Sequence, residues 1–190
     1  MALRPLPEDF KEFIDFLNAN NVCYLLVGGW AVGLHGYPRA TKDIDFLIAF
    51  DKNNLKKLKK ALYEFHAPTI DMEHFRKPGN FFRMGRSPVQ IDIITDAAGI
   101  DIKECYKRRM VINVKGTNIS VISREDLIKN KRATGRIQDL ADAQSLEKWK
   151  EIKRKTKSAR GKTSQSEYSK KHGKAGSKTR SNARRQEEGV

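Results

Sequence analysis

The sequence predicts an α/β fold in which helices pack on a small mixed β-sheet, followed by C-terminal helices and a disordered basic tail. Three observations predict it. Short apolar segments rich in β-branched residues alternate with segments whose apolar residues recur every three or four positions. Glycine, proline and asparagine lie between these segments and separate the elements. After residue 149 the apolar periodicity ends, and almost no aliphatic residues follow.

The first half of the chain contains the strongest periodic signals. Residues 8–20 carry Phe10, Phe13, Ile14 and Leu17 at helical spacing, and the Lys-rich segment 53–65 has the same pattern around Leu55 and Leu58. VCYLLV is apolar on both faces, which is typical of a buried strand. The expected elements are a helix over 8–20, a strand over 22–27, a short helix over 30–34, a strand over 44–48 and a helix over 53–65.

The second half is less regular. We expect an irregular segment over 68–87, because it is rich in glycine, proline and charge, and then a strand over 89–95. Residues 110–114 and 118–121 form a hairpin or two flanking strands. Ser123 is expected to cap a helix over 125–131, with Asp126 at the third helical position. A last helix is expected over 137–149, with an apolar face made of Ile137, Leu140, Leu146 and Trp149.

Charge divides the chain into two parts. The 190 residues have a net charge of +15, from 38 Lys and Arg against 23 Asp and Glu. Residues 150–190 hold 14 of the basic and four of the acidic residues, and such a segment cannot bury enough apolar surface to fold. We therefore expect one domain over 1–149 and a disordered basic tail over 150–190. The tail predicts a polyanionic partner such as nucleic acid, unless it only keeps the chain soluble.

Other protein classes are excluded by simple features. The only cysteines, Cys23 and Cys105, make no disulfide framework. The most apolar segment, residues 22–34, is too short for a membrane helix and contains three glycines. We therefore expect a soluble cytoplasmic protein without a membrane partner.

A glycine pair marks the first candidate site. Gly28 and Gly29 lie between a predicted strand and a predicted helix. Glycine lets the backbone approach a ligand closely, and the start of a helix offers N–H groups and a positive dipole end. The arrangement suits a phosphate, although a glycine pair alone also fits a simple tight turn.

Three aspartates form the second candidate site. Asp43 and Asp45 alternate with Ile44 on a strand, so their carboxylates share one face and repel by about 2–3 kcal/mol. Asp92 lies inside an aliphatic strand, where a carboxylate needs a partner or a ligand. If the two strands are neighbours, the three carboxylates can hold two Mg²⁺ ions. The alternative is a pair of solvent-facing aspartates on an edge strand.

Nearby polar residues are candidates for nucleotide binding. Arg39, Thr41 and Lys42 directly precede the aspartate pair, and Lys131 lies on a predicted helix. Their cations can neutralise phosphate charge. Asp139 and Asp142 are expected on the polar side of the last helix, where they cap it or pair with Arg136.

The ordered motifs resemble a known family. LLVGGWAVGLHGYPRATKDIDFLI, residues 25–48, resembles the glycine and D-x-D motifs of the DNA polymerase beta-like nucleotidyltransferase superfamily. Within it, the chain looks most like the minimal nucleotidyltransferases and the abortive-infection, AbiEii-type toxin branch. KNKRATGRIQDLADAQSL, residues 129–146, resembles the C-terminal helices of that family, whereas the tail has no counterpart that we can place.

The resemblance implies roles for named residues. Gly28 and Gly29 would hold the triphosphate, although the family's second position is often serine. Asp43 and Asp45 would hold the metal ions. Asp92 would complete the site and help to deprotonate the acceptor hydroxyl.

Two functions remain open at this point. The first is a Mg²⁺-dependent nucleotidyltransferase that moves a nucleoside monophosphate from an NTP to a hydroxyl of RNA, protein or a small molecule. Such an enzyme could be the toxin of a toxin–antitoxin system, with a cognate antitoxin as its partner. The second is a non-catalytic protein that binds nucleic acid or a partner on a degenerate form of the same fold. The sequence leaves the NTP and the acceptor undefined.

Overall fold

The computed structural model describes residues 5–37, 39–86 and 88–148. A compact unit ends at Glu147 and contains every strand and helix that positions the site. The predicted tail, residues 150–190, lies outside the described residues, and so does Trp149 of the expected apolar face. No helix within the described residues is both long and apolar enough to cross a membrane.

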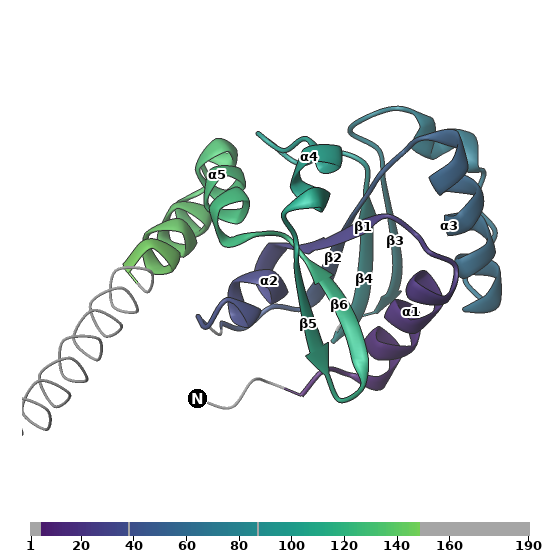
Figure 1. The fold of residues 1–190 in the computed structure, drawn as a ribbon, viewed down its shortest axis with the longest axis horizontal. Coiled ribbons are helices and arrows are strands. Elements are labelled where there is room, and N and C mark those ends of the chain that lie inside the picture. The colour runs from purple at the N-terminus through teal and green to yellow at the C-terminus, as the bar shows by residue number, and fades with distance from the viewer. Residues whose placement is uncertain (1–4, 38, 87, 149–190) are drawn as a thin grey trace, which may run out of the picture. The chain divides into compact units, whose positions relative to one another are not determined.

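The order of elements follows the predicted alternation of strands and helices (Figure 1). A last helical segment spans residues 137–148. The other elements are α1 (Glu8–Ala19), β1 (Tyr24–Val27), α2 (Gly28–Leu34), β2 (Asp43–Ile48), α3 (Lys52–Glu64), the 3-10 helix η1 (Met72–Arg76), β3 (Phe81–Arg86), β4 (Val89–Ile94), α4 (Ile102–Lys107), β5 (Met110–Val114), β6 (Thr117–Val121) and α5 (Arg124–Thr134).

The six strands form one mixed sheet in the order β3-β4-β2-β1-β6-β5. β2 pairs in parallel with β4, and β1 in parallel with β6, while the other neighbours are antiparallel. β5 and β6 form the hairpin that was one of the two expected arrangements. The predicted fold class, a small mixed sheet with helices packed on it, is confirmed.

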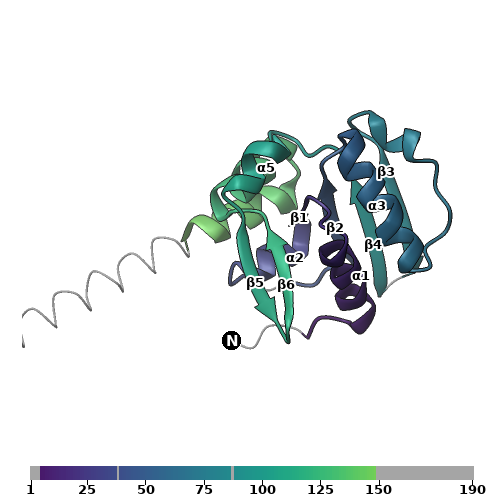
Figure 2. The ribbon, with the colours of Figure 1, turned by 45° about the vertical axis from the view of Figure 1, so that its right-hand side comes forward.

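Alternation along β2 separates the core from the site. Ile44 and Phe46 are buried on one face, and the rings of Phe13 from α1 and Tyr24 from β1 pack edge-on against Phe46. Figures 1 and 2 show α1 and α3 side by side on this face. The aspartates of β2 alternate with these core residues, so they point to the opposite face, which α1 and α3 leave open.

The expectation of an irregular segment over 68–87 was wrong. It contains η1 and β3, and β3 pairs with β4 along its whole length. β3 lies at the edge of the sheet, and its sequence FFRMGR carries two charges and a glycine, so it lacks the aliphatic signal of a central strand. The short α4 was also not predicted. Asp101 caps it by accepting hydrogen bonds from the backbone N–H groups of Lys103 and Glu104.

The last two helices were predicted in part. Ser123 caps α5 as expected, because its side chain accepts a hydrogen bond from the N–H of Asp126. The expected apolar face over 137–149 was wrong: Leu146 is buried, but Ile137 is 90% exposed and Leu140 is 41% exposed. Asp139 and Asp142 are buried, so the side of the helix that carries them faces the interior instead.

Candidate active site

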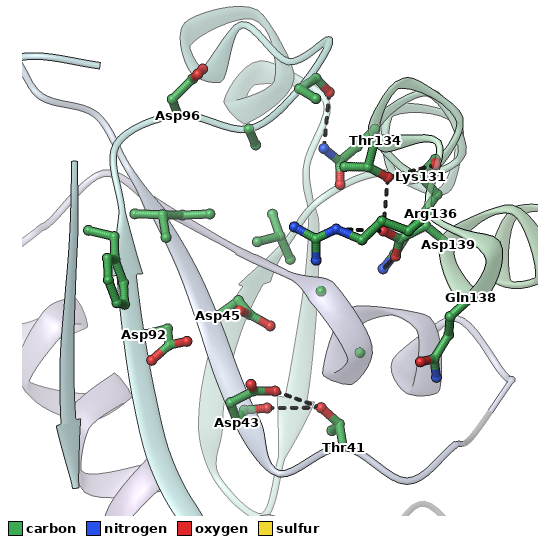
Figure 3. A pocket seen from close by; sticks show the side chains of 18 of the residues that line it. Thr41, Asp43, Asp45, Asp92, Asp96, Lys131, Thr134, Arg136, Gln138 and Asp139 are labelled. Atoms are coloured by element: carbon green, nitrogen blue, oxygen red, sulfur yellow. Dashed lines mark hydrogen bonds and ion pairs between the residues drawn. The ribbon is translucent and has the colours of Figure 1, made fainter. Parts of the chain in front are cut away.

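A cavity of about 640 Å³ opens where β1 ends and α2 begins. The ends of β1, β2, β3 and β4 form one wall, and residues of α5 and the last helix form the other (Figure 3). Its lining includes most of the residues singled out from the sequence, namely Gly28, Gly29, Arg39, Thr41, Asp43, Asp45, Asp92 and Lys131. Lys42, also a candidate, is exposed and is not among the residues that line the cavity.

The register of two parallel strands brings the three candidate carboxylates together. Asp45 of β2 lies directly beside Asp92 of β4, and Asp43 lies beside Gln90. Because side chains alternate along a strand, Asp43, Asp45 and Asp92 all point to the same face of the sheet. They lie in one cavity in Figure 3, as the sequence predicted from the condition that these strands are neighbours.

Asp45 carries an unfavourable charge in this setting. Burial, and then the nearby charges of Asp43 and Asp92, raise the pKa of Asp45 from 3.8 to about 6. Lys131 and Arg39 act in the opposite direction and do not offset this. Among the described residues, no side chain forms a hydrogen bond or ion pair with the Asp45 carboxylate. A carboxylate in that state is stabilised by a bound cation or by a proton.

Asp92 already has a cationic partner. Arg83 stands opposite Asp92 in the β3–β4 pair and donates two hydrogen bonds to it, Nε to Oδ1 at 2.8 Å and Nη2 to Oδ2 at 2.7 Å. Asp92 is buried, whereas Arg83 is half exposed, and the carboxylate raises the pKa of the guanidinium. Sequence reasoning missed Arg83, because it depends on β3 being a strand.

The donor set fits a hard divalent cation. Three carboxylates line one cavity, and two of them, Asp43 and Asp45, have no cationic partner among the described residues. Thr41 Oγ1 donates to Asp43 Oδ1 at 2.9 Å, which orients that carboxylate. Within the described residues, no three His, Cys, Asp or Glu side chains already surround a common metal position. Both oxygens of Asp92 are engaged by Arg83 in this arrangement.

The glycine pair lets the chain pass close to this carboxylate cluster. Gly28 has a φ of +64°, and a Cβ there would overlap Asp45 Oδ2. A Cβ on Gly29 would come within 2.8 Å of Thr41 Oγ1 and 3.1 Å of Arg39 Nη2. Both positions therefore require glycine for close approach, and α2 begins at Gly28 itself rather than at the expected residue 30.

A buried ionic network forms the other wall of the cavity. Arg39 Nε donates to Asp142 Oδ2 at 3.1 Å, and Lys131 Nζ lies 3.3 Å from the same carboxylate oxygen. Lys131 also pairs with Asp139, to which Thr134 Oγ1 donates at 2.9 Å. Lys131 and both aspartates are more than nine-tenths buried.

This network corrects the interpretation of the two aspartates. We expected Asp139 and Asp142 on the polar side of the last helix, where they cap it or pair with Arg136; both are instead buried beside Lys131. Arg136 does approach Asp139, at 4.0 Å, yet it is the weaker of that carboxylate's two cationic contacts. Arg136 also lines the cavity and was not singled out as a site residue.

Comparison with known proteins agrees with this geometry. The family described as nucleotidyl transferase AbiEii toxin, Type IV TA system, matches residues 17–186. The chain belongs to the AbiEii nucleotidyl transferase toxin family. The match to the AbiEii family extends beyond residues 20–95 and 129–146, to which the sequence resemblance applied, and it includes most of the tail for which we found no counterpart.

Solved structures with related folds are also known. The antibiotic-resistance factor ANT(2″)-Ia has a TM-score of 0.50 and 13% identity, with 87% of this chain and 96% of that chain covered. An antigenic nucleotidyltransferase-like protein from Paracoccidioides brasiliensis has a TM-score of 0.46 and 21% identity, with 75% and 78% covered. The first likeness concerns the fold alone. No curated protein matches the sequence.

Proposed function

We propose that this AbiEii-family chain transfers a nucleoside monophosphate from an NTP to a hydroxyl group, with RNA as the favoured acceptor and Mg²⁺ as the cofactor. One observation carries the proposal: Asp43, Asp45 and Asp92 line a single cavity against which Gly28 is packed. The three carboxylates would suit divalent cations, and the glycine turn beside them would suit phosphates.

The proposed reaction is a substitution at the α-phosphorus. The acceptor hydroxyl oxygen forms a bond to that phosphorus, and the bond to the oxygen leading to the β-phosphate breaks. Its electron pair leaves with pyrophosphate, and the hydroxyl proton passes to a base. By position, the residue for that last role is Asp92, the third carboxylate of the set. Asp43 and Asp45 would hold two Mg²⁺ ions together with Asp92, and such ions would neutralise phosphate charge and activate the attacking oxygen.

The remaining lining residues suit the triphosphate. Gly28 and Gly29 line the cavity where α2 begins, so the N–H groups of this first turn would be the donors to phosphate oxygens. Arg39 and Lys131 present cations on the opposite wall, and Asp142 fixes both of them in position. A cation held by a buried carboxylate is pre-organised, so little conformational freedom is lost when a phosphate binds. Lys42 lies outside the cavity, so its cation would reach only phosphate groups at the cavity entrance.

The partners follow from charge and family. An RNA acceptor is favoured because the chain has a net charge of +15, and residues 150–190 supply many of the cations. A cognate antitoxin is a further proposed partner, because the family comprises toxins of a toxin–antitoxin system.

Label transfer tests the proposed activity. The full chain is incubated with each α-labelled NTP, Mg²⁺ and total RNA, and RNA and protein are then separated. We expect label in RNA, release of pyrophosphate, and loss of both with Asp45→Asn. An enzyme that labels no RNA, protein or small molecule would refute the proposal. Unchanged activity of Asp45→Asn in cells would favour the non-catalytic alternative.

A further inference from the structure

Positive charge in the compact unit is concentrated in one continuous segment. Residues 52–86, which form α3, η1 and β3, contain nine basic and three acidic residues, a net charge of +6. The other described residues up to Glu147 contain thirteen basic and sixteen acidic residues, a net charge of −3. The net charge of this segment therefore differs in sign, as well as in magnitude, from that of the rest of the unit.

The charges of α3 line a groove. A cavity of about 530 Å³ lies between α3 and η1, with Lys52, Lys56 and Lys59 along it and Leu55 and Met72 among its apolar lining. The lysines are four and three residues apart, so they lie on one side of the helix over a length of about 10 Å. All three are exposed, and among the described residues none forms an ion pair. Lys60, outside the groove, pairs with Glu64.

The acidic residues of the groove are already engaged locally. Asp71 accepts a hydrogen bond from the N–H of Glu73 and caps η1. Glu73 receives two hydrogen bonds from Arg76 Nη1, at 3.1 and 2.8 Å. Arg76 neutralises Glu73, whereas Asp71 keeps its charge, so three lysines face one aspartate in the groove. This positive excess points to a polyanion as the ligand.

The groove is connected to the candidate active site through the residues that join η1 to β3. Thr95 Oγ1 donates to the carbonyl of Lys77 at 2.9 Å and accepts from the N–H of Asn80 at 3.2 Å. Ile94 and Asp96, on either side of Thr95, line the active-site cavity. Phe81, which directly follows the segment 77–80, also lines that cavity, so this segment leads from η1 to the cavity rim. Figure 2 shows β3 at the edge of the sheet, with α3 beside it.

We propose that this basic edge, from the cavity rim over residues 76–80 to the lysine groove, binds the phosphate backbone of the RNA acceptor. The inference rests on the proposed function and adds to it the surface that holds the acceptor. The groove shares no lining residue with the active-site cavity, so an NTP in that cavity does not occupy it. A polymer whose hydroxyl end enters the cavity continues outward across the edge. Lysine cations bind such a backbone independently of its sequence.

The test compares two triple charge reversals in the full chain. The groove variant is Lys52→Glu/Lys56→Glu/Lys59→Glu. The matched control, Lys103→Glu/Lys115→Glu/Lys129→Glu, reverses three exposed lysines on α4, the β5–β6 turn and α5. Both change the net charge by the same amount, so a general effect of charge, including any binding by residues 150–190, is common to both. Circular dichroism checks folding, and a Lys→Gln groove variant replaces the triple Glu variant if that fails to fold.

Binding is measured by fluorescence anisotropy with a labelled RNA hairpin at several salt concentrations, and transfer by labelling of the same hairpin. We expect the groove variant to bind RNA at least tenfold more weakly than the control. The slope of log affinity against log salt should fall by about 2–3, because each lost phosphate contact removes about 0.7–0.9. NTP binding in Mg²⁺ should be unchanged.

Equal weakening in both variants, or none in either, would overturn the proposed surface. The proposed surface would also be overturned if the wild-type chain labels a protein instead of RNA and the groove variant binds RNA as well as the control does. If the groove variant alone loses RNA affinity but the wild-type chain transfers no label, the proposed function fails and the binding surface stands. If the wild-type chain labels RNA and the two variants match, only the surface fails.

Discussion

Replacing Asp45 by asparagine should stabilise the protein when divalent cations are absent. The substitution keeps the size of the side chain and removes a charge that is buried beside Asp43 and Asp92. The folded pKa of about 6 lies above the ordinary value of 3.8, so the folded state binds the proton more tightly than the unfolded state. Ionisation of Asp45 therefore costs stability as the pH rises from about 4 through 6, and the full cost remains above pH 6.

The magnitude follows from the two pKa values. The difference corresponds to about 3 kcal/mol at pH 8, about 1.5 kcal/mol at pH 5 and about 0.5 kcal/mol at pH 4. These are upper values, because Asp45 retains partial exposure to the solvent in the cavity. Asp45→Asn should recover most of this free energy at pH 8 and almost none at pH 4.

Urea unfolding of the full chain in EDTA, at pH 8, 5 and 4, measures these differences. The matched control is Asp96→Asn, which makes the same chemical change at an exposed aspartate of the same cavity and should alter stability by less than about 0.5 kcal/mol. Mg²⁺ should then stabilise the wild type more than Asp45→Asn. A variant that is no more stable than the wild type at pH 8, or that gains equally at pH 4 and pH 8, would refute the reasoning.

Three further substitutions test the walls of the cavity. Gly28→Ala should destabilise the protein by at least about 1–2 kcal/mol in urea and abolish transfer, because its φ is positive and its Cβ would meet Asp45; wild-type stability would contradict this. Arg83→Gln leaves Asp92 without its cation, so the melting temperature in EDTA should fall. Added Mn²⁺ should then raise the melting temperature of the variant more than that of the wild type. An equal rise would count against competition between Arg83 and the metal ion for Asp92. Lys131→Met removes the nearest cation of buried Asp139 and one of the two cations of Asp142, so it should lower the free energy of unfolding by about 3 kcal/mol; a variant as stable as the wild type would argue against it.

The carboxylate site could be predicted from the sequence because its signal is local. Alternation along one strand puts Asp43 and Asp45 on the same face, and a carboxylate inside an aliphatic strand marks Asp92. The one non-local condition was that the two strands are neighbours. A small sheet allows only a few strand orders, and in the observed order β2 and β4 are neighbours.

The cationic partners could not be predicted in the same way. Arg83 reaches Asp92 only because β3 is an edge strand paired with β4, and an edge strand with charges gives no aliphatic signal. On the last helix, the apolar pattern favoured an inward side with Ile137 and Leu140. Ion pairs of Asp139 and Asp142 with buried cations outweigh that preference, so tertiary charge pairing, which no window of sequence contains, sets the rotation of the helix.

The charge balance of the cavity supports joint binding of nucleotide and divalent cation. Its lining has four basic and five acidic side chains: Arg39, Arg83, Lys131 and Arg136 against Asp43, Asp45, Asp92, Asp96 and Asp139. Each of the four cations already lies within 4.0 Å of a carboxylate. The charges without a cationic partner among the described residues are therefore negative, and they include Asp43 and Asp45. A bare triphosphate entering this cavity meets repulsion from those carboxylates, whereas a triphosphate that arrives with divalent cations neutralises them. If the proposed function holds, the affinity for an NTP should therefore depend on a divalent cation, and the buried charge of Asp45 is the main reason.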